Sequence, residues 1–309
     1  MTDRIAPPRE LLRRYGLTAR HSWGQNFLHE VAIHDAIVEA AELSPRTRAV
    51  EIGAGLGTLT DRLLGTGSEV WAIERDRDLC GVLRAELGAR PGFRLFEADA
   101  VKFDYSSARD EARPRPPIIG NLPYQLTGPL LFALLAHHDA VGPWIIMVQE
   151  EVAQRLCAEP GSRRYGGVTA SLSRVRSIAT VCRAPRGCFL PAPRVDSAVI
   201  RLDPLTRPRG EVGDDLGYQA LVRTAFQRRR KVLSNALSAL APRDEVLAWC
   251  HAAGVDPRTR PERLGPEEFA ALQRAREEDA ALEDRSERAA TSDEGDGRDP
   301  KRRDDPPSA

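Results

Sequence analysis

The chain has 309 residues, of which 41% are hydrophobic and 29% are charged, and its formal net charge at pH 7 is zero. This length is enough for one large domain with a small one, or for two medium domains. Its longest apolar stretches, such as residues 130–136, are too short to span a membrane, which argues against a membrane-spanning protein.

The charge is unevenly distributed along the chain. Residues 277–309 hold twelve acids and six bases, a net charge of −6. Of the 45 bases and 45 acids in the whole sequence, residues 1–276 therefore keep 39 bases and 33 acids, a net charge of +6. Arginine accounts for 42 of the bases, and its guanidinium suits phosphate binding, although a GC-rich genome would produce the same bias. The basic body of the chain is compatible with a nucleic-acid partner.

The cysteine and histidine patterns favour neither a disulfide framework nor a metal site. The five cysteines are odd in number and form no Cys-x-x-Cys pair, so we expect reduced thiols in a cytoplasmic protein. His137 and His138 have only Asp139 beside them, which is more typical of a helix end than of a metal site. The first 14 residues carry charges without an apolar core segment, so we expect no secretory signal.

Apolar runs that read as strands alternate with amphipathic helical patterns over the first two thirds of the chain. The expected strands are 48–52, 69–74, 93–96, 117–120 and 144–148, and the expected helices are 31–41, 59–64, 78–87 and 129–136. Two further strands are expected at 179–182 and 197–202. This alternation predicts an α/β fold with a mostly parallel, doubly wound, Rossmann-like sheet.

The composition changes after this sheet. Residues 204–213 are rich in Pro, Gly and Arg and read as a linker, and only helical patterns follow, at 218–226, 232–240, 245–253 and 267–276. From position 277 the apolar residues vanish, so we expect a charged tail without fixed structure. The predicted organisation is an N-terminal segment (1–30), a Rossmann-like domain (31–205), a small all-helical domain (214–276) and the tail (277–309).

A glycine-rich loop, EIGAGLG at residues 51–57, joins the first predicted strand to its helix. Glycines let the backbone turn sharply and let a ligand approach closely. The third glycine follows the second by two positions instead of three, which departs from the dinucleotide-binding spacing, and the leading acid Glu51 also favours S-adenosylmethionine. A tight turn without a ligand is the alternative interpretation.

Two acidic residues follow the next strands. Glu74 ends the second strand, where a carboxylate can accept hydrogen bonds from both ribose hydroxyls of a nucleoside. Asp99 follows the third strand and could accept a hydrogen bond from an adenine amine. Together with Gly53 and Gly55, these positions predict a nucleoside-containing cofactor.

The tetrapeptide Asn121-Leu122-Pro123-Tyr124 follows the fourth strand and suits the grip of a planar base. The Asn121 Oδ1 and the carbonyl oxygen of Leu122, held extended before proline, can accept hydrogen bonds from both N–H groups of an exocyclic amine. Such acceptors localise the lone pair of the amine nitrogen, and the ring of Tyr124 can stack on the base, which would have to be flipped out of a duplex. An ordinary Asn-x-Pro turn is the alternative, and the cofactor loop makes methylation of an amine the favoured hypothesis.

With these motifs, the sequence resembles the ribosomal RNA adenine N6-dimethyltransferases over residues 14–275. The motifs that carry the resemblance are GQNFL at 24–28, the glycine loop at 51–57, NLPY at 121–124, VQEEVA at 148–153 and FLPAPRVDS at 189–197. Residues 128–131, 160–166 and 256–262 resemble the bacterial small-subunit branch of the family, the KsgA group. Ala54 stands where the family usually has proline, and Gln125 where it often has asparagine.

The resemblance implies a Rossmann-like class I S-adenosylmethionine-dependent methyltransferase. It implies N6-dimethylation of two adjacent adenosines near the 3′ end of 16S rRNA in a small-subunit ribosomal particle, and thus a role in ribosome biogenesis. The cofactor contacts that it implies are Asn26, Leu28, Gly53, Glu74, Asp99 and Asn121. It also implies that Phe189 packs beside the target base with Tyr124.

A run of five bases without an acid, Arg223, Arg228, Arg229, Arg230 and Lys231, opens the helical domain. A solvated helix face is the commoner meaning of such a run. Because phosphate contacts supply most of the affinity for RNA, we expect these side chains to contact rRNA.

The sequence thus predicts a cytoplasmic, monomeric rRNA adenine dimethyltransferase that uses S-adenosylmethionine and no metal. A resistance-type enzyme acting on large-subunit rRNA is a close rival. An assembly or transcription factor that keeps the fold without catalysis is another, against which the intact Asn121-to-Tyr124 set argues. A DNA adenine methylase is disfavoured because those enzymes usually show Asp in place of Asn121.

Overall fold

The computed structural model describes residues 4–20 and 23–293. The chain divides into two compact units. Among the described residues, unit 1 comprises those up to 209 together with 262–266, and unit 2 comprises residues 210–261 and 267–293. The division after residue 209 falls inside the Pro- and Gly-rich segment 204–213.

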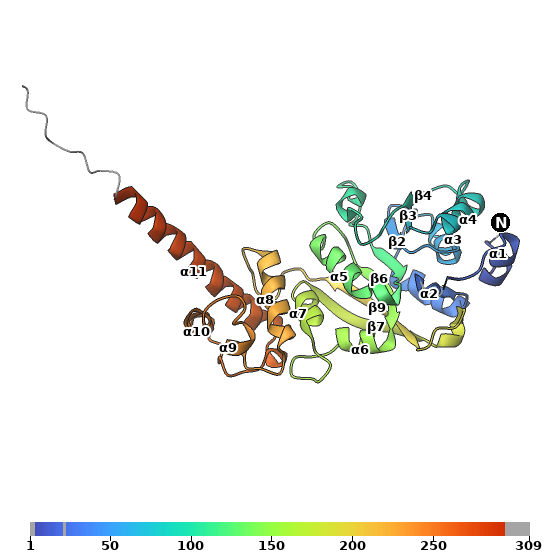
Figure 1. Ribbon diagram of the computed structural model, residues 1–309. Coiled ribbons are helices and arrows are strands. Elements are labelled where there is room, and N and C mark those ends of the chain that lie inside the picture. Colours follow the sequence, from blue (N-terminus) through green and yellow to red (C-terminus); the bar gives the residue numbers. More distant parts are fainter. Residues whose placement is uncertain (1–3, 21–22, 294–309) are drawn as a thin grey trace, which may run out of the picture. The chain divides into compact units, whose positions relative to one another are not determined.

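Unit 1 is built on a seven-stranded sheet with the order β4-β3-β2-β5-β6-β9-β7 (Figure 1). Its strands are β2 (Arg48–Ile52), β3 (Glu69–Glu74), β4 (Phe93–Glu97), β5 (Ile118–Asn121), β6 (Trp144–Gln149), β7 (Arg176–Ala184) and β9 (Ser197–Pro204). The first five are parallel, and β9 runs antiparallel between β6 and β7. The prediction of a mostly parallel, doubly wound sheet is confirmed.

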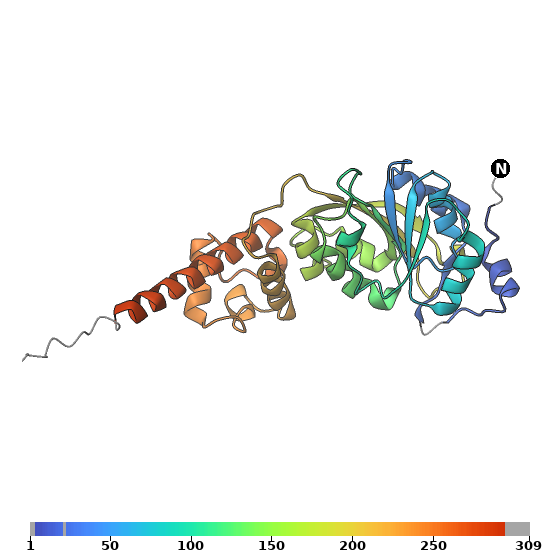
Figure 2. The ribbon, with the colours of Figure 1, turned by 90° about the horizontal axis from the view of Figure 1, so that it is seen from above.

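Helices cover both faces of this sheet, as Figure 2 shows. They are α2 (Val31–Ala40), α3 (Thr58–Leu64) and α4 (Arg77–Leu87) on one face, and α5 (Thr127–Ala136), α6 (Glu150–Leu156) and α7 (Gly167–Ser173) on the other. Neighbouring strand residues alternate between the two apolar layers, so that Val50 packs with α5 and Ala49 packs with α2 and α3. This alternation follows from the two-residue period of a strand, and it places Glu51 on the α2 and α3 side.

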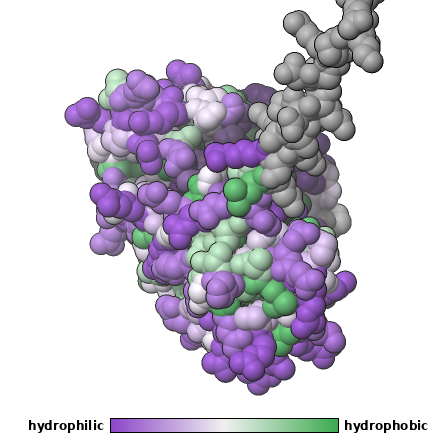
Figure 3. All heavy atoms as spheres, turned by 90° about the vertical axis from the view of Figure 1, so that its left-hand side faces the viewer, coloured by the Kyte–Doolittle hydropathy of each residue, from purple (hydrophilic) through white to green (hydrophobic). Residues whose placement is uncertain are grey.

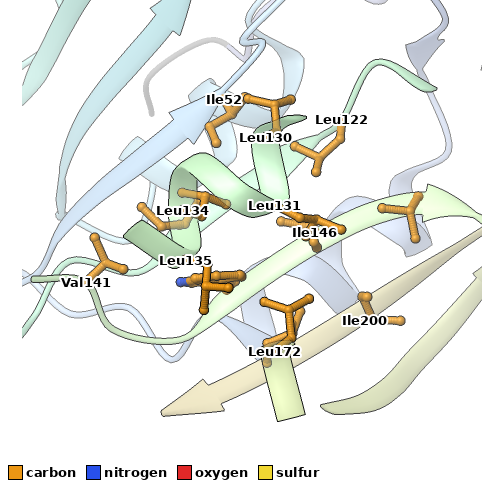
Figure 4. Close-up of a cluster of buried hydrophobic side chains, with 14 of the residues drawn as sticks. Ile52, Leu122, Leu130, Leu131, Leu134, Leu135, Val141, Ile146, Leu172 and Ile200 are labelled. Carbon is orange, nitrogen blue, oxygen red and sulfur yellow. The ribbon is translucent and has the colours of Figure 1, made fainter. Parts of the chain in front are cut away.

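The layer between the sheet and α5 is the larger apolar cluster (Figure 4). Leu130, Leu131, Leu134 and Leu135 recur at helical spacing and lie against the sheet. Leu122 belongs to the same layer and is fully buried. The tetrapeptide after β5 is therefore anchored in the core by its second side chain.

Several short elements of the chain have no counterpart in the predicted set. They are α1 (Pro8–Arg14), β1 (Phe27–Leu28), η2 (Tyr105–Ala108), η3 (Tyr124–Leu126), α6, α7, η4 (Arg186–Cys188), β8 (Phe189–Leu190) and η5 (Pro261–Arg263). β1 and β8 form a separate two-stranded antiparallel ladder in which Phe27 is paired with Leu190 and Leu28 with Phe189. Two-residue strands and seven-residue helices are too short to produce a readable hydrophobic period.

Unit 2 is helical, with α8 (Asp215–Gln227), α9 (Leu233–Ala236), α10 (Arg243–Ala252) and α11, which begins at Pro266 and ends at Asp293. Phe226 of α8 lies 5.9 Å from Phe269 of α11 between ring centroids, and the Trp249 indole donates to Asp279 at 2.8 Å. No helix in the described part of the chain is long and apolar enough to cross a membrane.

The expected loss of structure from position 277 is wrong for residues 277–293, which continue α11. The segment lacks an apolar face, but its Ala, Glu and Arg residues are strong helix formers, and helix formation does not require burial. Glu277 also accepts hydrogen bonds from the backbone amides of Gly213 and Asp214, each at 2.9 Å. The rest of the predicted tail, 294–309, lies outside the described residues.

Candidate active site

A hollow of about 1060 Å³, counting the part open to solvent, lies in unit 1 at the carboxyl ends of its central parallel strands. Its walls include residues 23–28, 51–56, 73–75 and 98–101, together with His34, Asn121 and Met147. The carboxyl edge of an open α/β sheet is the usual ligand site, because the connecting loops part there. The N-terminal segment forms one wall of this hollow.

The glycine loop turns the chain from β2 into α3 beneath the hollow. Gly53, Gly55 and Gly57 adopt φ values of +69°, +60° and +85°, a region that favours glycine. A Cβ on Gly55 would lie 3.4 Å from the ring of Phe27, so the N-terminal segment passes directly over this turn. A Cβ on Gly57 would lie 2.9 Å from a Leu87 methyl group, so this third glycine serves the packing of α3 on α4.

Glu74 ends β3 with its carboxylate held by backbone amides. Its Oε2 accepts from Gly55 N, and its Oε1 accepts from Arg75 N and Asp76 N, each at 2.9 Å. The residue is 8% exposed, and burial raises the pKa of Glu74 against the effect of these amides. The carboxylate is therefore fixed in position at the pocket wall before any ligand arrives.

Asp99 lies two residues beyond the end of the neighbouring strand β4. Its Oδ1 accepts from the backbone amide of Val101 at 3.0 Å, and the residue lines the same hollow as Glu74. Glu74 is paired with Glu97 across β3 and β4. The structure thus brings the two predicted nucleoside acceptors into one pocket, at the carboxyl ends of adjacent strands.

Glu51 is a buried pocket residue that the predicted contact set did not include. It is 2% exposed, and its Oε2 has no hydrogen-bond partner among the described residues. Burial raises the pKa of Glu51 to about 8; the neighbouring Thr60 hydroxyl opposes this rise and the charge of Glu74 adds to it. His34 from α2 lines the pocket as well, and burial lowers the pKa of His34 to about 4, so its ring is neutral.

Asn121, the last residue of β5, has its amide oriented by the N-terminal segment. Its Nδ2 donates to the backbone carbonyl of Asn26 at 3.0 Å, across 95 residues of sequence. Asn26 in turn donates through its own Nδ2 to the carbonyl of Gly24 at 3.1 Å. The Asn121 Oδ1 accepts no hydrogen bond within the described part of the chain, so an acceptor stands at the pocket wall.

The residues after Asn121 are fixed by the core and by β9. The Leu122 amide donates to the Met147 carbonyl at 3.0 Å, while the Leu122 side chain is buried in the core. Tyr124 begins η3, its hydroxyl lies 2.8 Å from the Ser197 Oγ, and burial raises the pKa of this phenol. Neither Leu122 nor Tyr124 forms part of the described pocket wall.

Phe189 is 3% exposed and lies in the apolar layer with Leu28 and Met147, both of which line the pocket. Through the β1–β8 ladder it braces Leu28 and does not itself form part of the described wall. Phe189 therefore packs on the side of Leu28 away from the pocket and supports the wall formed by the N-terminal segment.

Comparisons with known proteins agree on one family. The family model for ribosomal RNA adenine dimethylase matches residues 16–275. The chain belongs to the ribosomal RNA adenine dimethylase family. It is 42% identical to the ribosomal RNA small subunit methyltransferase A of Myxococcus xanthus, covering 87% of this chain and 94% of that protein. It is 44% identical to the protein of the same name from Anaeromyxobacter dehalogenans, covering 89% and 99%.

Solved structures support the same fold. A dimethyladenosine transferase from Plasmodium falciparum superposes with a TM-score of 0.63 at 24% identity, covering 80% of this chain and 95% of that one. The 23S rRNA methyltransferase ErmE superposes with a TM-score of 0.61 at 25% identity, covering 81% and 99%. As a ribosomal RNA adenine dimethylase, the chain is an S-adenosylmethionine-dependent methyltransferase.

The pocket of this rRNA adenine dimethylase fits that cofactor. Glu74 and Asp99 offer acceptors for a ribose and an adenine amine, and the unpartnered buried Oε2 of Glu51 suits the cationic half of the molecule. The turn at Gly53 and Gly55 leaves backbone without side chains at the wall. Among the described residues, no three His, Cys, Asp or Glu side chains gather as a metal ion would require.

The predicted RNA-binding bases of this dimethylase lie in unit 2, mainly in the turn after α8. Only Arg223 is on the helix, while residues 228–231 follow its end at Gln227. Arg223, Arg228, Arg230 and Lys231 are exposed, and Arg228 donates to the Ser238 hydroxyl at 3.0 Å. Figure 3, which views the molecule from the side of α10 and α11, shows mainly hydrophilic residues around a smaller hydrophobic area.

The whole predicted cofactor-binding set lines the pocket, together with further residues. Asn26, Leu28, Gly53, Gly55, Glu74, Asp99 and Asn121 all do so. Trp23, His34, Arg75 and Met147 also line it and were not predicted. Three of these residues adjoin a feature of the sequence: Trp23 directly precedes the GQNFL motif, Arg75 directly follows Glu74, and Met147 directly precedes the VQEEVA motif. His34 adjoins none of them.

Proposed function

We propose that this enzyme dimethylates N6 of two adjacent adenosines near the 3′ end of 16S rRNA in a small ribosomal subunit particle, as part of ribosome biogenesis. The observation that carries the proposal is the orientation of Asn121, whose amide nitrogen is engaged by Asn26 and whose oxygen is free at the pocket wall. The relatives that are 42% and 44% identical bear the name ribosomal RNA small subunit methyltransferase A.

The chain's own groups prepare the amine for reaction. The Asn121 Oδ1 accepts one N–H of the adenine amine and the Leu122 carbonyl accepts the other, which favours a tetrahedral nitrogen with a localised lone pair. S-adenosylmethionine, when bound, supplies the methyl group as an electrophile. No strong general base is required, because the amine proton is acidic once the nitrogen is alkylated. Tyr124 and Phe189 are proposed to bound the space that the base enters.

The rRNA contact is proposed for unit 2. The turn formed by residues 228–231 with Arg223 presents exposed bases without an intervening acid, and such bases neutralise phosphates independently of sequence. We place the enzyme in the cytoplasm as a monomer, where its ribosomal substrate is assembled.

A large-subunit rRNA is the second candidate substrate, because the similarity to ErmE covers 81% of the chain. The identity to ErmE is 25%, against 42% and 44% for the small-subunit relatives, which favours the small subunit.

The test incubates the protein with labelled S-adenosylmethionine and, separately, undermodified small-subunit particles, naked large-subunit rRNA and duplex DNA. We expect label in N6,N6-dimethyladenosine from the small-subunit particles alone. Label in large-subunit rRNA would replace the proposal by the second candidate, and no label in any RNA would reject both.

A further inference from the structure

The N-terminal segment is fastened to the pocket rim by a polar turn at Arg20 and Gln25. The Gln25 Nε2 and the Arg20 Nη1 donate to the same Asp76 Oδ2, at 2.7 and 2.9 Å, and Arg20 also pairs with Asp78. The Arg20 amide donates to the Gln25 Oε1 at 2.8 Å. Asp76 is buried and caps α4 by accepting from the Asp78 amide, so the turn is anchored to a rigid element.

This turn holds Trp23 at the mouth of the pocket. The guanidinium carbon of Arg75 lies 4.4 Å from the ring centroid of Trp23, and that of Arg20 lies 5.2 Å from it. Both distances are within the range of cation–π attraction. Trp23 is 38% exposed and lines the hollow, whereas Trp71, Trp144 and Trp249 are buried in the cores of the two units.

We propose that Trp23 and Arg75 form the outer wall against which the adenosine half of the cofactor binds. Arg75 directly follows Glu74, and both line the pocket with Trp23 and Asp99. A nucleoside whose ribose meets Glu74 and whose amine meets Asp99 therefore lies beside the indole and the guanidinium. The inference rests on the S-adenosylmethionine chemistry of the family and does not depend on which RNA is methylated.

An aromatic ring braced by arginine is also a surface on which an RNA base could stack. The cofactor is the better occupant, because Arg75 directly follows Glu74 and lies 4.4 Å from the Trp23 ring, and the pocket that these residues line also contains Asp99. The experiment separates the two occupants, since cofactor binding can be measured without RNA.

The first measurement is the tryptophan fluorescence of the full-length protein during titration with S-adenosylhomocysteine. Trp23 is the partly exposed member of the four tryptophans, so we expect saturable change in its emission. The Trp23→Phe variant should keep the affinity, measured by calorimetry, and lose most of the fluorescence change. An unaltered fluorescence change in Trp23→Phe would overturn the proposal.

The second measurement compares affinities for S-adenosylhomocysteine across variants. Trp23→Ala should weaken binding roughly tenfold, as expected from the loss of one aromatic contact to a base, and Trp23→Phe should restore most of it. Arg75→Ala should weaken binding roughly threefold, the lower range of a cation–π contact. The matched control is Arg77→Ala, since Arg77 is exposed, pairs with Glu97 and does not line the pocket.

Activity at saturating cofactor separates this role from the chemical step. Trp23→Ala should raise the KM for S-adenosylmethionine and leave kcat within about twofold, with an unchanged thermal midpoint for unfolding. Unchanged S-adenosylhomocysteine affinity with a raised KM for the ribosomal particle would overturn the proposal and assign Trp23 to RNA. Failure of the proposed 16S activity would leave the cofactor titration, which contains no RNA, unaffected.

Discussion

The cofactor end and the base end of the pocket are built in different ways. At the cofactor end, Glu74 is held by three backbone amides from its own and the neighbouring loop. At the base end, Asn121 depends on a carbonyl of the N-terminal segment for its orientation, and Phe189 supports that segment from behind. One end is set by the sheet and its adjacent turns, and the other by a segment distant in sequence.

With the roles that we propose for Glu74 and Asn121, this difference predicts that binding and reactivity can be changed separately. A carboxylate fixed by local amides is preorganised whether or not substrate is present. The amide of Asn121 is oriented by a hydrogen bond from its nitrogen to the backbone carbonyl of Asn26, a residue distant in sequence. Changes at the cofactor end should therefore act mainly on affinity, and changes at the base end mainly on turnover.

The largest effect is expected for Asn121→Ala. Loss of the oriented acceptor should reduce kcat on the order of 10²-fold, by analogy with the removal of one preorganised polar group from a reacting centre. S-adenosylhomocysteine binding, measured by calorimetry, should remain detectable. Gln125→Ala is the matched control, because Gln125 is exposed and does not line the pocket. Unchanged turnover in Asn121→Ala would reject the proposed role of its amide.

Glu74→Gln tests the opposite end. Hydrogen bonds to a charged acceptor are worth about 1.5–3 kcal/mol, so affinity for S-adenosylhomocysteine should fall roughly tenfold or more. At saturating cofactor, kcat should stay close to that of the unchanged protein. Glu97→Gln, an exposed acid at the end of β4 outside the pocket wall, serves as control. A kcat loss as large as that of Asn121→Ala would contradict the division between the two ends.

Glu51→Gln tests whether the buried carboxyl group of Glu51 lowers the stability of the folded, ligand-free protein. Because burial raises the pKa of Glu51 from 4.5 to about 8, the folded state binds the proton more tightly than the unfolded state. Stability should therefore fall as pH rises from 4.5 toward 8, by up to about 1.4 kcal/mol per pH unit for this group.

The variant lacks this titration, so its free energy of unfolding in urea should exceed that of the unchanged protein more at pH 7.5 than at pH 5.5. Thr60→Val, which removes the neighbouring hydroxyl and keeps the carboxylate, should retain the pH dependence. A difference between Glu51→Gln and the unchanged protein that does not vary with pH would show that Glu51 is not the titrating group.

The smallest effect is expected for Arg230→Ala with Lys231→Ala in unit 2. Each lost phosphate contact should lower the slope of log affinity against log salt by about one, with cofactor affinity unchanged. Filter binding of the ribosomal particle at several salt concentrations measures this slope. Arg258→Ala is the control, since Arg258 is exposed in the same unit and pairs with Asp256. An unaltered slope in the double variant would move the RNA contact away from this turn.

The elements that could be predicted from the sequence are those with a clear local pattern. Hydrophobic runs placed the seven strands of the main sheet within a few residues, because a buried strand is apolar along its own length. The β1–β8 ladder and the helices α6 and α7 escaped prediction, since their short runs have no period. The opposite holds for residues 277–293, where the lack of apolar residues predicts no fixed structure although the segment continues α11.

The sequence by itself determined the chemistry of the pocket: a glycine turn after the first strand of the sheet, Glu74 and Asp99 at the ends of the next two, and Asn121 at the end of β5. Parallel strands bring their carboxyl ends to one edge, so these local signals converge without further information. Only the tertiary structure decided which way the Asn121 amide faces, that Phe189 lies behind Leu28, and that Trp23 stands against Arg75. Those contacts join segments that are far apart in the chain. A local sequence pattern does not indicate which distant residue a side chain will contact.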